Sequence, residues 1–335
     1  MNRKENALIA LKGGVPESVP CWFNDYELMF VSPMGERPPL GESEGYDGYG
    51  VHLTASAAAG GAFTPTPSVP PVLTDIVQWR EQVHFPDYDS VDWESAYKKD
   101  EAVFQWDREN KVQDMFCANG LFERMHYLMG FEDALCALYE EPEAAEELIK
   151  AIADTKIKLI RHTLKIYKPD VFTFLDDYAH QNGLFMSTDM FREFFKPHLK
   201  RIRDAVKEEG VLFKIHCCGN MEKLTKEYID IGVDAIDPVQ PMNDVLAMKK
   251  LLAGRIGIVG GLDVQNVIDR DGATGDEARA EVRRCIDTYA PGGGYTLYCA
   301  SVKGRDPEAL KPDGVIGALK DEAEKYGKDY YKKDK

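Results

Sequence analysis

Short runs of β-branched and aromatic residues alternate with longer segments of helical periodicity from about residue 110 onward. Strands that alternate with helices form a parallel sheet. The runs are apolar almost throughout, as expected for strands that are covered on both faces. We therefore predict parallel strands in seven stretches, of which the first lies near the N-terminus: 19–23, 112–119, 170–177, 211–217, 234–240, 255–263 and 293–299.

This alternation predicts a single (β/α)8 barrel over residues 1–335, with one strand that the pattern misses. An open doubly wound sheet is the alternative that the same pattern permits. The longest helix-like segment begins at Ser187 or Thr188, either of which is a suitable N-cap, and ends at Gly210. Pro197 lies inside it and predicts a kink.

Two stretches do not follow the repeat. Residues 31–86 are rich in Gly, Pro and Ala and are too long for an ordinary connection in a compact domain. We expect them to form an active-site cover or an elaborated loop region attached to the barrel. Residues 329–335 mix lysines with aspartates and are expected to be a polar, solvated tail.

Composition restricts the partners and the compartment. The formal net charge is −16, and no clustered basic face is visible, so nucleic acid is not an expected partner. No apolar stretch reaches the length of a signal peptide or of a membrane span, which predicts a cytoplasmic protein without membrane contact. Seven cysteines, an odd number, do not form a disulfide framework in such a chain.

Polar side chains follow almost every predicted strand. In a parallel barrel the catalytic groups gather at the carboxyl ends of the strands, although a polar residue there is also a common turn former or helix cap. Asp176, Asp177 and the nearby His180 are our candidates for acid–base or electrostatic roles. The candidates for binding substrate at this rim are Asn24, Asn119, Gln240 and Asp263.

The stretch "KIHCCGN" (214–220) ends one of the predicted strands. His216 and Cys218 are two residues apart on extended chain and point to the same side, whereas Cys217 points to the other side and is expected to pack in the core. Cys299, at the end of the last strand, is the candidate for a third soft ligand. One imidazole and two thiolates suit Zn²⁺ and leave one coordination position open, as in catalytic sites.

The fourth position on such a zinc ion would be taken by water, by substrate or by a carboxylate. Glu27 and Glu123 are both candidates for that carboxylate, and the sequence does not rank them.

Several of these segments resemble one known family. "DDYAHQNGLFMSTDMFREFFKPHLKRI", "KIHCCGN", "GVDAIDPVQ" and "GIVGGLD", together with "DGYGVHL" and "GGGYTLYC", resemble the uroporphyrinogen decarboxylase superfamily over most of the chain. The resemblance implies a (β/α)8 barrel with an N-terminal elaboration. True decarboxylases of the superfamily carry arginines near the first strand, but "VPCWFNDYELMF" (19–30) contains none.

The second branch of the superfamily consists of corrinoid-dependent methyltransferases with a zinc motif of His-x-Cys and a distant Cys. His216, Cys218 and Cys299 match this motif position by position. The resemblance therefore implies a zinc methyltransferase that works with a separate corrinoid (cobalamin) protein, because nothing in this chain resembles a cobalamin-binding module.

Two hypotheses for the small-molecule partner and two rival function classes remain. Trp22 and its aromatic neighbours suit a methoxylated aromatic compound, which favours O-demethylation. The predicted zinc set fits thiols equally well, so methylcorrinoid:thiol methyltransfer remains open. A metal-free decarboxylase and a non-catalytic subunit that binds the corrinoid protein are the rival classes.

Overall fold

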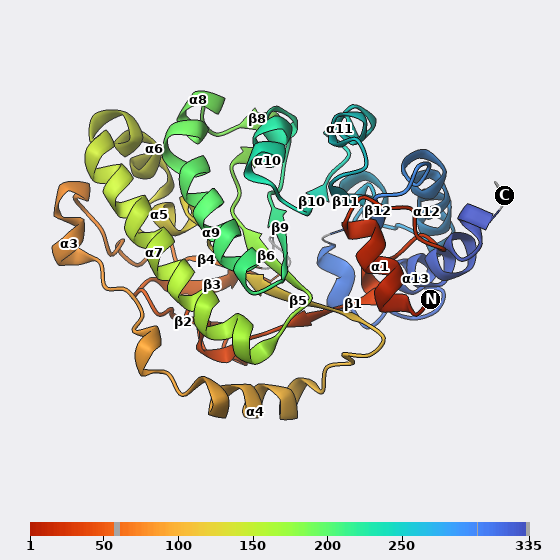
Figure 1. Cartoon of the computed structure of the whole chain (residues 1–335), viewed down its shortest axis with the longest axis horizontal. Helices are drawn as coiled ribbons and strands as arrows, with labels where there is room; N and C mark the ends of the chain where they lie inside the picture. The colour runs from red at the N-terminus through yellow and green to blue at the C-terminus, as the bar shows by residue number, and fades with distance from the viewer. Residues whose placement is uncertain (57–60, 300, 333–335) are drawn as a thin grey trace.

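The computed structural model describes residues 1–56, 61–299 and 301–332. Its centre is a seven-stranded sheet in which all neighbouring strands are parallel, in the order β1-β5-β6-β9-β10-β11-β12. The sheet curls on itself and carries most of the helices on its outer side (Figure 1). The strands are β1 (Tyr26–Met29), β5 (Val112–Cys117), β6 (Val171–Leu175), β9 (Leu212–His216), β10 (Ala235–Val239), β11 (Gly257–Gly261) and β12 (Tyr295–Tyr298).

Six of the seven predicted strands are confirmed, each within two residues or so of its predicted bounds. The prediction of a strand at residues 19–23 was wrong. Trp22–Asp25 forms a short helix, α2, in which the Asp25 carboxylate accepts a hydrogen bond from the backbone N–H of Cys21. The first strand, β1, begins one residue after this helix.

The chain just before α2 lies against the last strand. Cys21 forms an isolated parallel bridge with Leu297, and the Leu297 N–H donates to the carbonyl of Pro20 at 2.9 Å. This contact brings the beginning of the barrel-forming chain next to β12 and gives the curled sheet its barrel-like shape. The structure therefore shows seven parallel strands in a mixed α/β fold of the barrel type; an eighth strand is a prediction that the described residues do not contain.

Long amphipathic helices cover the sheet. The largest is α7, whose buried face includes Leu148, Ile152 and Ile160. Both chain ends lie on the same side of the molecule, beside α1 and α13 (Figure 1). The α-helices of about two turns or more are α1 (Arg3–Leu11), α4 (Trp93–Phe104), α5 (Phe122–Met129), α6 (Phe131–Glu140), α7 (Pro142–Tyr167), α9 (Lys196–Glu208), α10 (Thr225–Ile231), α11 (Val245–Leu252), α12 (Gly275–Tyr289) and α13 (Val315–Gly327).

The shorter helical segments connect these elements. They are α2 (Trp22–Asp25), α3 (Trp79–Gln82), α8 (Thr188–Met190), the 3₁₀ turns η1 (Ser32–Met34), η3 (Ile76–Gln78), η4 (Tyr88–Ser90), η6 (Glu222–Leu224), η8 (Val302–Arg305) and η9 (Tyr330–Lys332), and the π-helical turns η5 (Phe191–Phe195) and η7 (Val264–Ile268).

The predicted helix between Ser187 and Gly210 is present, and a π-helical turn interrupts it. The Ser187 hydroxyl accepts from the N–H of Met190, so Ser187 is its N-cap. The π-helical turn η5 comes just before Pro197, because a proline cannot donate the α-helical hydrogen bond expected at its position. Gly210 has a φ of 75°, a backbone conformation that suits glycine, and the helix ends before it.

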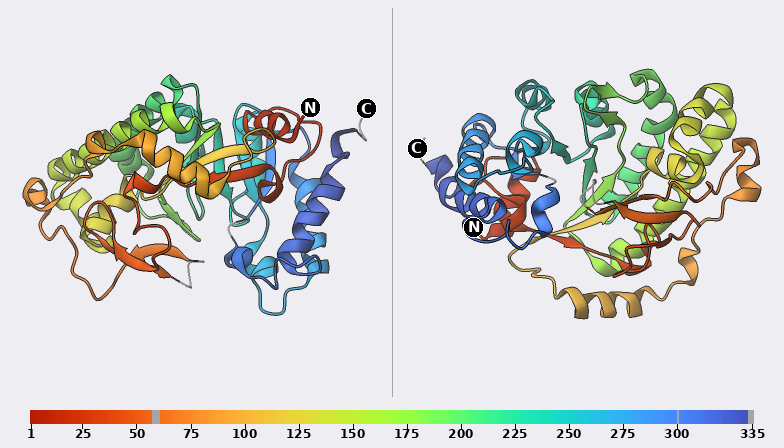
Figure 2. Two further views of the ribbon diagram at one scale, coloured as in Figure 1. Left: turned by 90° about the horizontal axis from the view of Figure 1, so that it is seen from below. Right: turned by 180° about the vertical axis from the view of Figure 1, so that it is seen from behind.

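Residues 31–86 contain structure that the sequence pattern did not predict. They form a small antiparallel sheet, β2-β3-β4, that projects beyond the helices (Figure 2, left). This small sheet contacts α5, since the Tyr127 hydroxyl donates to the carbonyl of Phe63 at 2.9 Å. Its strands are β2 (Glu44–Tyr46), β3 (His52–Ser56) and β4 (Ala62–Pro65); a further hairpin after β6 pairs β7 (Ala179–His180) with β8 (Gly183–Leu184).

The amino ends of the strands are closed by apolar packing. Tyr26, Val112 and Val171 begin their strands and form a separate buried cluster with Ala7 and Leu11 of α1. Because this end is filled, a small molecule can reach polar groups of the barrel only from the carboxyl ends of the strands. Within the described residues, none of the helices combines the length and the apolar character that a bilayer crossing requires.

Candidate metal centre

Three potential metal ligands meet where β6 and β9 end. One ligand atom each from Asp177, His216 and Cys218 lies within 4.8 Å of the other two. Strand register explains this, because Leu175 of β6 lies level with His216 of β9. Asp177 and Cys218 are each two residues further along and so are level with each other, on the same face. We call these three residues the metal group.

The backbone around the metal group fixes its two outer members. The N–H of Cys218 donates to Asp177 Oδ1 at 2.6 Å. The sulfur of Cys218 is 3.5 Å from His216 Nε2. Cys217 faces the other way, fully buried, and its sulfur accepts from the N–H of Tyr178, as expected for a packing cysteine.

His216 is oriented by a carboxylate on the next strand. Its Nδ1 is 2.7 Å from Asp237 Oδ1, and the register of β9 with β10 places these two residues side by side. A neutral imidazole bound in this way carries its proton on Nδ1 and leaves the Nε2 lone pair facing Cys218, which is the geometry of a metal-binding histidine. The ring of Phe116 packs edge-on against the imidazole at 5.6 Å between ring centres.

One layer below, a buried lysine holds that carboxylate. Lys214 Nζ is 2.7 Å from Asp114 Oδ2 and 3.2 Å from Asp237 Oδ2, and all three side chains are at most 4% exposed. Burial alone would raise the pKa of Asp237, but Lys214 and His216 lower it below its usual value. We call Asp114, Lys214 and Asp237 the support chain, because they fix the charge and the position of the group that orients His216.

Apart from His216, whose charge lowers the pKa of Asp177, the metal group has no cationic partner among the described residues. Burial raises the pKa of Asp177, and burial together with Asp177 raises the pKa of the Cys218 thiol. No lysine or arginine ion pair to Asp177 occurs in the described part of the chain. Nitrogen, sulfur and carboxylate oxygen are the ligand types of Zn²⁺, and a divalent cation would remove the electrostatic cost of burying two acidic groups together. The residues therefore fit a zinc ion.

Cys299 lies outside this group. It is 3% exposed and follows β12, and burial raises the pKa of its thiol. The charged or ionisable groups that act on it most are Cys21, Asp269 and Glu281. The structure thus brings together two of the three ligands predicted from the sequence and adds Asp177, which the sequence suggested for acid–base work.

Asp176 is buried as a helix anchor. Its two oxygens accept from the N–H groups of Leu121, Phe122 and Glu123 at 2.6–3.2 Å, and the Tyr178 hydroxyl also donates to it. Burial nevertheless raises the pKa of Asp176 to about 6. These contacts hold the first turn of α5 against the end of β6, so Asp176 positions its neighbours.

The other predicted rim residues are not members of the metal group. The exposed ring of His180 stacks on Phe185 and is not part of the metal group. Asn24 donates from its side chain to the carbonyl of Lys320 in α13, and Asn119 donates to the carbonyl of Glu36 at 2.7 Å. Both asparagines therefore tie peripheral segments to the barrel.

Gln240 and Asp263 follow the carboxyl ends of β10 and β11, whereas Trp22 packs beside the apolar cluster at the amino ends of the strands. The half-buried Trp22 packs against Tyr298 with 5.0 Å between ring centres. Gln240 Oε1 accepts from the N–H of Gly219, the residue after Cys218, at 2.7 Å. Asp263 caps η7 through the N–H of Asn266 at 3.0 Å.

The two candidates for an extra carboxylate are now distinguishable. Glu27 Oε2 already accepts from the N–H of Asp107 at 2.7 Å. Glu123, in contrast, is buried, and its Oε2 has no hydrogen-bond partner among the described residues. Burial, and then Asp177 and Asp176, raise the pKa of Glu123 well above its usual value, so Glu123 lies near the metal group and Glu27 does not.

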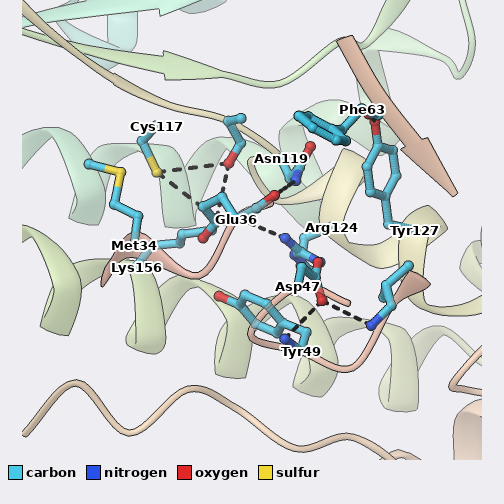
Figure 3. Close-up of polar contacts among 12 residues, drawn as sticks. Met34, Glu36, Asp47, Tyr49, Phe63, Cys117, Asn119, Arg124, Tyr127 and Lys156 are labelled. Atoms are coloured by element: carbon cyan, nitrogen blue, oxygen red, sulfur yellow. Dashed lines mark hydrogen bonds and ion pairs between the residues drawn. The ribbon is translucent and has the colours of Figure 1, made fainter. Parts of the chain in front are cut away.

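A second buried charge network lies behind Asn119 (Figure 3). Arg124 pairs with Glu36 at 2.7 Å and with Asp47, and it stacks on the Tyr49 ring at 3.9 Å. Lys156 of α7 pairs with the same Glu36. We call Glu36, Asp47, Arg124 and Lys156 the clamp, because these residues fasten the 31–86 segment to α5 and α7.

Two hollows are present in the described surface. The larger, of about 660 Å³, lies outside the barrel between α7 and α9. Its charged residues are already paired, for example Lys158 with Asp89 and Arg201 with Asp154. The smaller, of about 280 Å³, lies at the carboxyl ends of β10 and β11 and includes Gln240 and Asp263. The smaller hollow is connected to the metal group, because its lining residue Gln240 accepts from the N–H of Gly219, which follows Cys218 in the chain.

Sequence reasoning missed the support chain. Asp237 and Lys214 look like ordinary polar interruptions of two strands, and only their position inside the barrel reveals their partners. An aspartate or a lysine in the middle of an otherwise apolar strand was the available indication, because such charges are rarely buried unless they are paired.

Comparisons with known proteins place the chain among its relatives. The profile of the family "Uroporphyrinogen decarboxylase (URO-D)" matches residues 108–300, more than half of the chain. The chain belongs to this family. A search of curated proteins found no match. Among solved structures, a methyltransferase from Methanosarcina mazei has a TM-score of 0.66 and 16% sequence identity, with 97% of this chain and 99% of that chain covered. At this identity the likeness shows a shared fold alone.

Proposed function

We propose that this protein is a zinc-dependent methyltransferase that moves a methyl group between a small molecule and the cobalt of a corrinoid carried by a partner protein. The observation that supports it most is the metal group, whose three ligand atoms lie within 4.8 Å of one another at the functional end of the barrel. Membership of the URO-D family and the fold shared with a methyltransferase agree with a transferase.

His216 and Cys218 are the proposed ligands common to every version of this site. We assign the third position to Asp177, which is already part of the metal group. Cys299, the third ligand predicted from the sequence, is the competitor for that position. Glu123 is the remaining carboxylate near the group and lacks a partner at Oε2.

The residues around the metal group have separable tasks. Asp237 holds the proton on Nδ1 of His216, and Lys214 keeps Asp237 charged and in place. Phe116 and Tyr298 supply aromatic walls from β5 and β12. A zinc ion bound here would act as a Lewis acid on an ether oxygen or would stabilise a thiolate, and the corrinoid would supply the cobalt that carries the methyl group.

We favour a methoxylated aromatic compound as the methyl donor. Three elements contribute half-buried aromatic residues: Phe116 of β5 packs on His216, and Trp22 of α2 packs on Tyr298 of β12. Flat apolar walls next to a Lewis-acid site suit an aryl methyl ether. Methylcorrinoid:thiol transfer is the alternative that the sulfur-tolerant zinc site supports.

The first experiment measures zinc content by elemental analysis of freshly purified protein. We expect about one zinc per chain in the wild type and none in Cys218→Ala, since loss of one of three ligands removes most of the affinity. Asp177→Asn and Cys299→Ala form a matched pair: we expect the first to lose zinc and the second to retain it. The opposite pattern would assign the third position to Cys299.

Transfer is then measured with methylated or reduced corrinoid protein and a panel of aryl methyl ethers and thiols. We expect activity in the zinc-loaded wild type and not in Cys218→Ala. A wild type that is free of zinc when chelators are avoided throughout, or that decarboxylates a porphyrinogen in their presence, would disprove the proposal.

A further inference from the structure

The smaller hollow at the carboxyl ends of β10 and β11 has a chemical character of its own. Its volume is about 280 Å³. We call it the amide recess, because its polar lining consists of four side-chain amides and one carboxylate: Gln181, Gln240, Gln265, Asn266 and Asp263.

The amide recess is joined to the metal group by the backbone. Gln240 accepts from the N–H of Gly219, which directly follows the proposed ligand Cys218. From the other side, the N–H of Asn220 donates to the carbonyl of His180, which directly precedes Gln181. The loop that carries the cysteine ligand is therefore hydrogen-bonded to two of the segments that line the recess.

The lining still offers hydrogen-bonding groups. Gln240 uses its side-chain oxygen on Gly219, which leaves its amide N–H groups for another acceptor. Among the described contacts, the side chains of Gln181 and Gln265 form no hydrogen bond. Asp263 is held rigidly by both the backbone N–H and the side-chain amide of Asn266, at 3.0–3.1 Å.

Charge decides which chemistry the amide recess accepts. Its lining contains one carboxylate and no lysine, arginine or histidine, and the whole chain has a formal net charge of −16. An anionic group would meet Asp263 without a cation to balance it, whereas a hydroxyl or an ammonium group would be attracted.

We propose that the amide recess binds the non-methyl end of the substrate and selects a neutral or positively charged hydrogen-bonding group over a carboxylate, a sulfonate or a phosphate. This inference rests on the proposed function, because it places the methyl-bearing end of the same molecule at the metal group. It adds a substrate class: the substrate is a polar, non-anionic molecule.

The test compares three aryl methyl ethers that differ only at the para position: 4-methoxybenzylamine, 4-methoxybenzyl alcohol and 4-methoxybenzoate. Their dissociation constants are measured by titration calorimetry on the zinc-loaded protein without corrinoid protein, so no turnover is needed. We expect the benzoate to bind the wild type weakest, with the amine favoured over it by roughly three- to fivefold, as for one partly exposed charge contact.

Two variants change the charge of the recess. Asp263→Asn is expected to remove most of the advantage of the amine, and Gln265→Lys is expected to make the benzoate the tightest of the three. Val77→Lys is the matched control, because it adds the same charge at an exposed residue of η3, far along the chain from the recess. We expect it to leave the order unchanged.

The outcomes separate this inference from the proposed function. An unchanged order in Gln265→Lys, or a wild type that prefers the benzoate, would overturn the role of the recess even if methyl transfer is observed. If no aryl ether binds, the methoxyarene assignment fails, and the same comparison is made with cysteamine, 2-mercaptoethanol and mercaptoacetate. An absence of charge preference in that series as well would overturn the inference.

Discussion

The clamp and the support chain are two buried charge networks built on the same barrel, and they differ in how their charges balance. In the clamp, the two carboxylates of Glu36 and Asp47 face the two cations Arg124 and Lys156, and the members are at most 4% exposed at their side chains. In the support chain, Lys214 alone faces Asp114 and Asp237.

The unbalanced negative charge of the support chain lies next to the metal group. The second carboxylate oxygen of Asp237, Oδ1, is hydrogen-bonded to His216, and the carboxylate of Asp177 lies close by. Burying unbalanced charge is costly, so a closed network is what a structural fastening requires, and an open one is what a cation site requires. The comparison teaches that charge balance, rather than burial or the number of ion pairs, distinguishes the two.

Removing the single lysine from each network gives the largest expected effect. Lys156→Met and Lys214→Met each leave buried carboxylates without their cation, so we expect the free energy of unfolding to fall by about 3–5 kcal/mol. Denaturant unfolding measures it. Lys150→Met, on the exposed side of α7 in an ion pair with Asp154, is the control and should change stability by less than about 0.5 kcal/mol.

Of the two lysine variants, only Lys214→Met is expected to affect the metal group. We expect Lys156→Met to keep the zinc content of the wild type, because the clamp does not contact the metal group. If the free energy of unfolding falls by less than about 1 kcal/mol in Lys156→Met, the clamp is not a closed network of buried ion pairs.

Added zinc sharpens the comparison further. At a free zinc concentration of about 100 times the dissociation constant, the wild type and Lys156→Met should both gain about 2.7 kcal/mol of unfolding free energy. Lys214→Met should gain more, because the metal then compensates two unpaired carboxylates. The gain should be absent in His216→Ala, and an equal gain in that variant would place the zinc elsewhere.

A smaller effect concerns the pH dependence of stability, through His126 of α5, the helix that also carries Arg124 of the clamp. Burial, and then the nearby Arg124, lower the pKa of His126 to about 4. Its ordinary value is about 6.5, so the unfolded chain takes up a proton before the folded one does. This contribution to stability is present above about pH 6.5 and is lost as the pH falls toward 4, by about 2 kcal/mol after allowance for partial exposure.

His126→Phe tests this contribution, since the imidazole already lies between Phe122 and Phe131 at 5.2 and 5.4 Å between ring centres. We expect a flatter decline of unfolding free energy between about pH 6.5 and pH 4 than in the wild type. The exposed His84, replaced by Gln, should leave the decline as it is. Parallel declines in wild type and His126→Phe would contradict the prediction.

The local pattern of the sequence determined the strands and the helices of this protein. Apolar runs of strand length and the helical periodicity between Ser187 and Gly210 depend only on neighbouring residues, and they predicted six strands and this helix. The two-residue period of extended chain also predicted that His216 and Cys218 share a side and that Cys217 packs away from them. The strand expected at residues 19–23 does not form because Trp22–Asp25 is a helical turn, in which the Asp25 carboxylate accepts from the N–H of Cys21.

The partners of each side chain were decided only by the tertiary structure. Asp177 lies beside Cys218, and Asp237 beside His216, because of how β6, β9 and β10 are aligned. Asn119 follows a strand, as Gln240 does, and Asn24 precedes one. The side chain of Asn24 is hydrogen-bonded to α13, and that of Asn119 to the 31–86 segment. The periodicity of a chain encodes which side of its own strand a residue occupies, but the register between strands depends on packing among residues far apart in sequence. The sequence therefore determined at which end of the strands the site lies, and the register between the strands determined which residues form it.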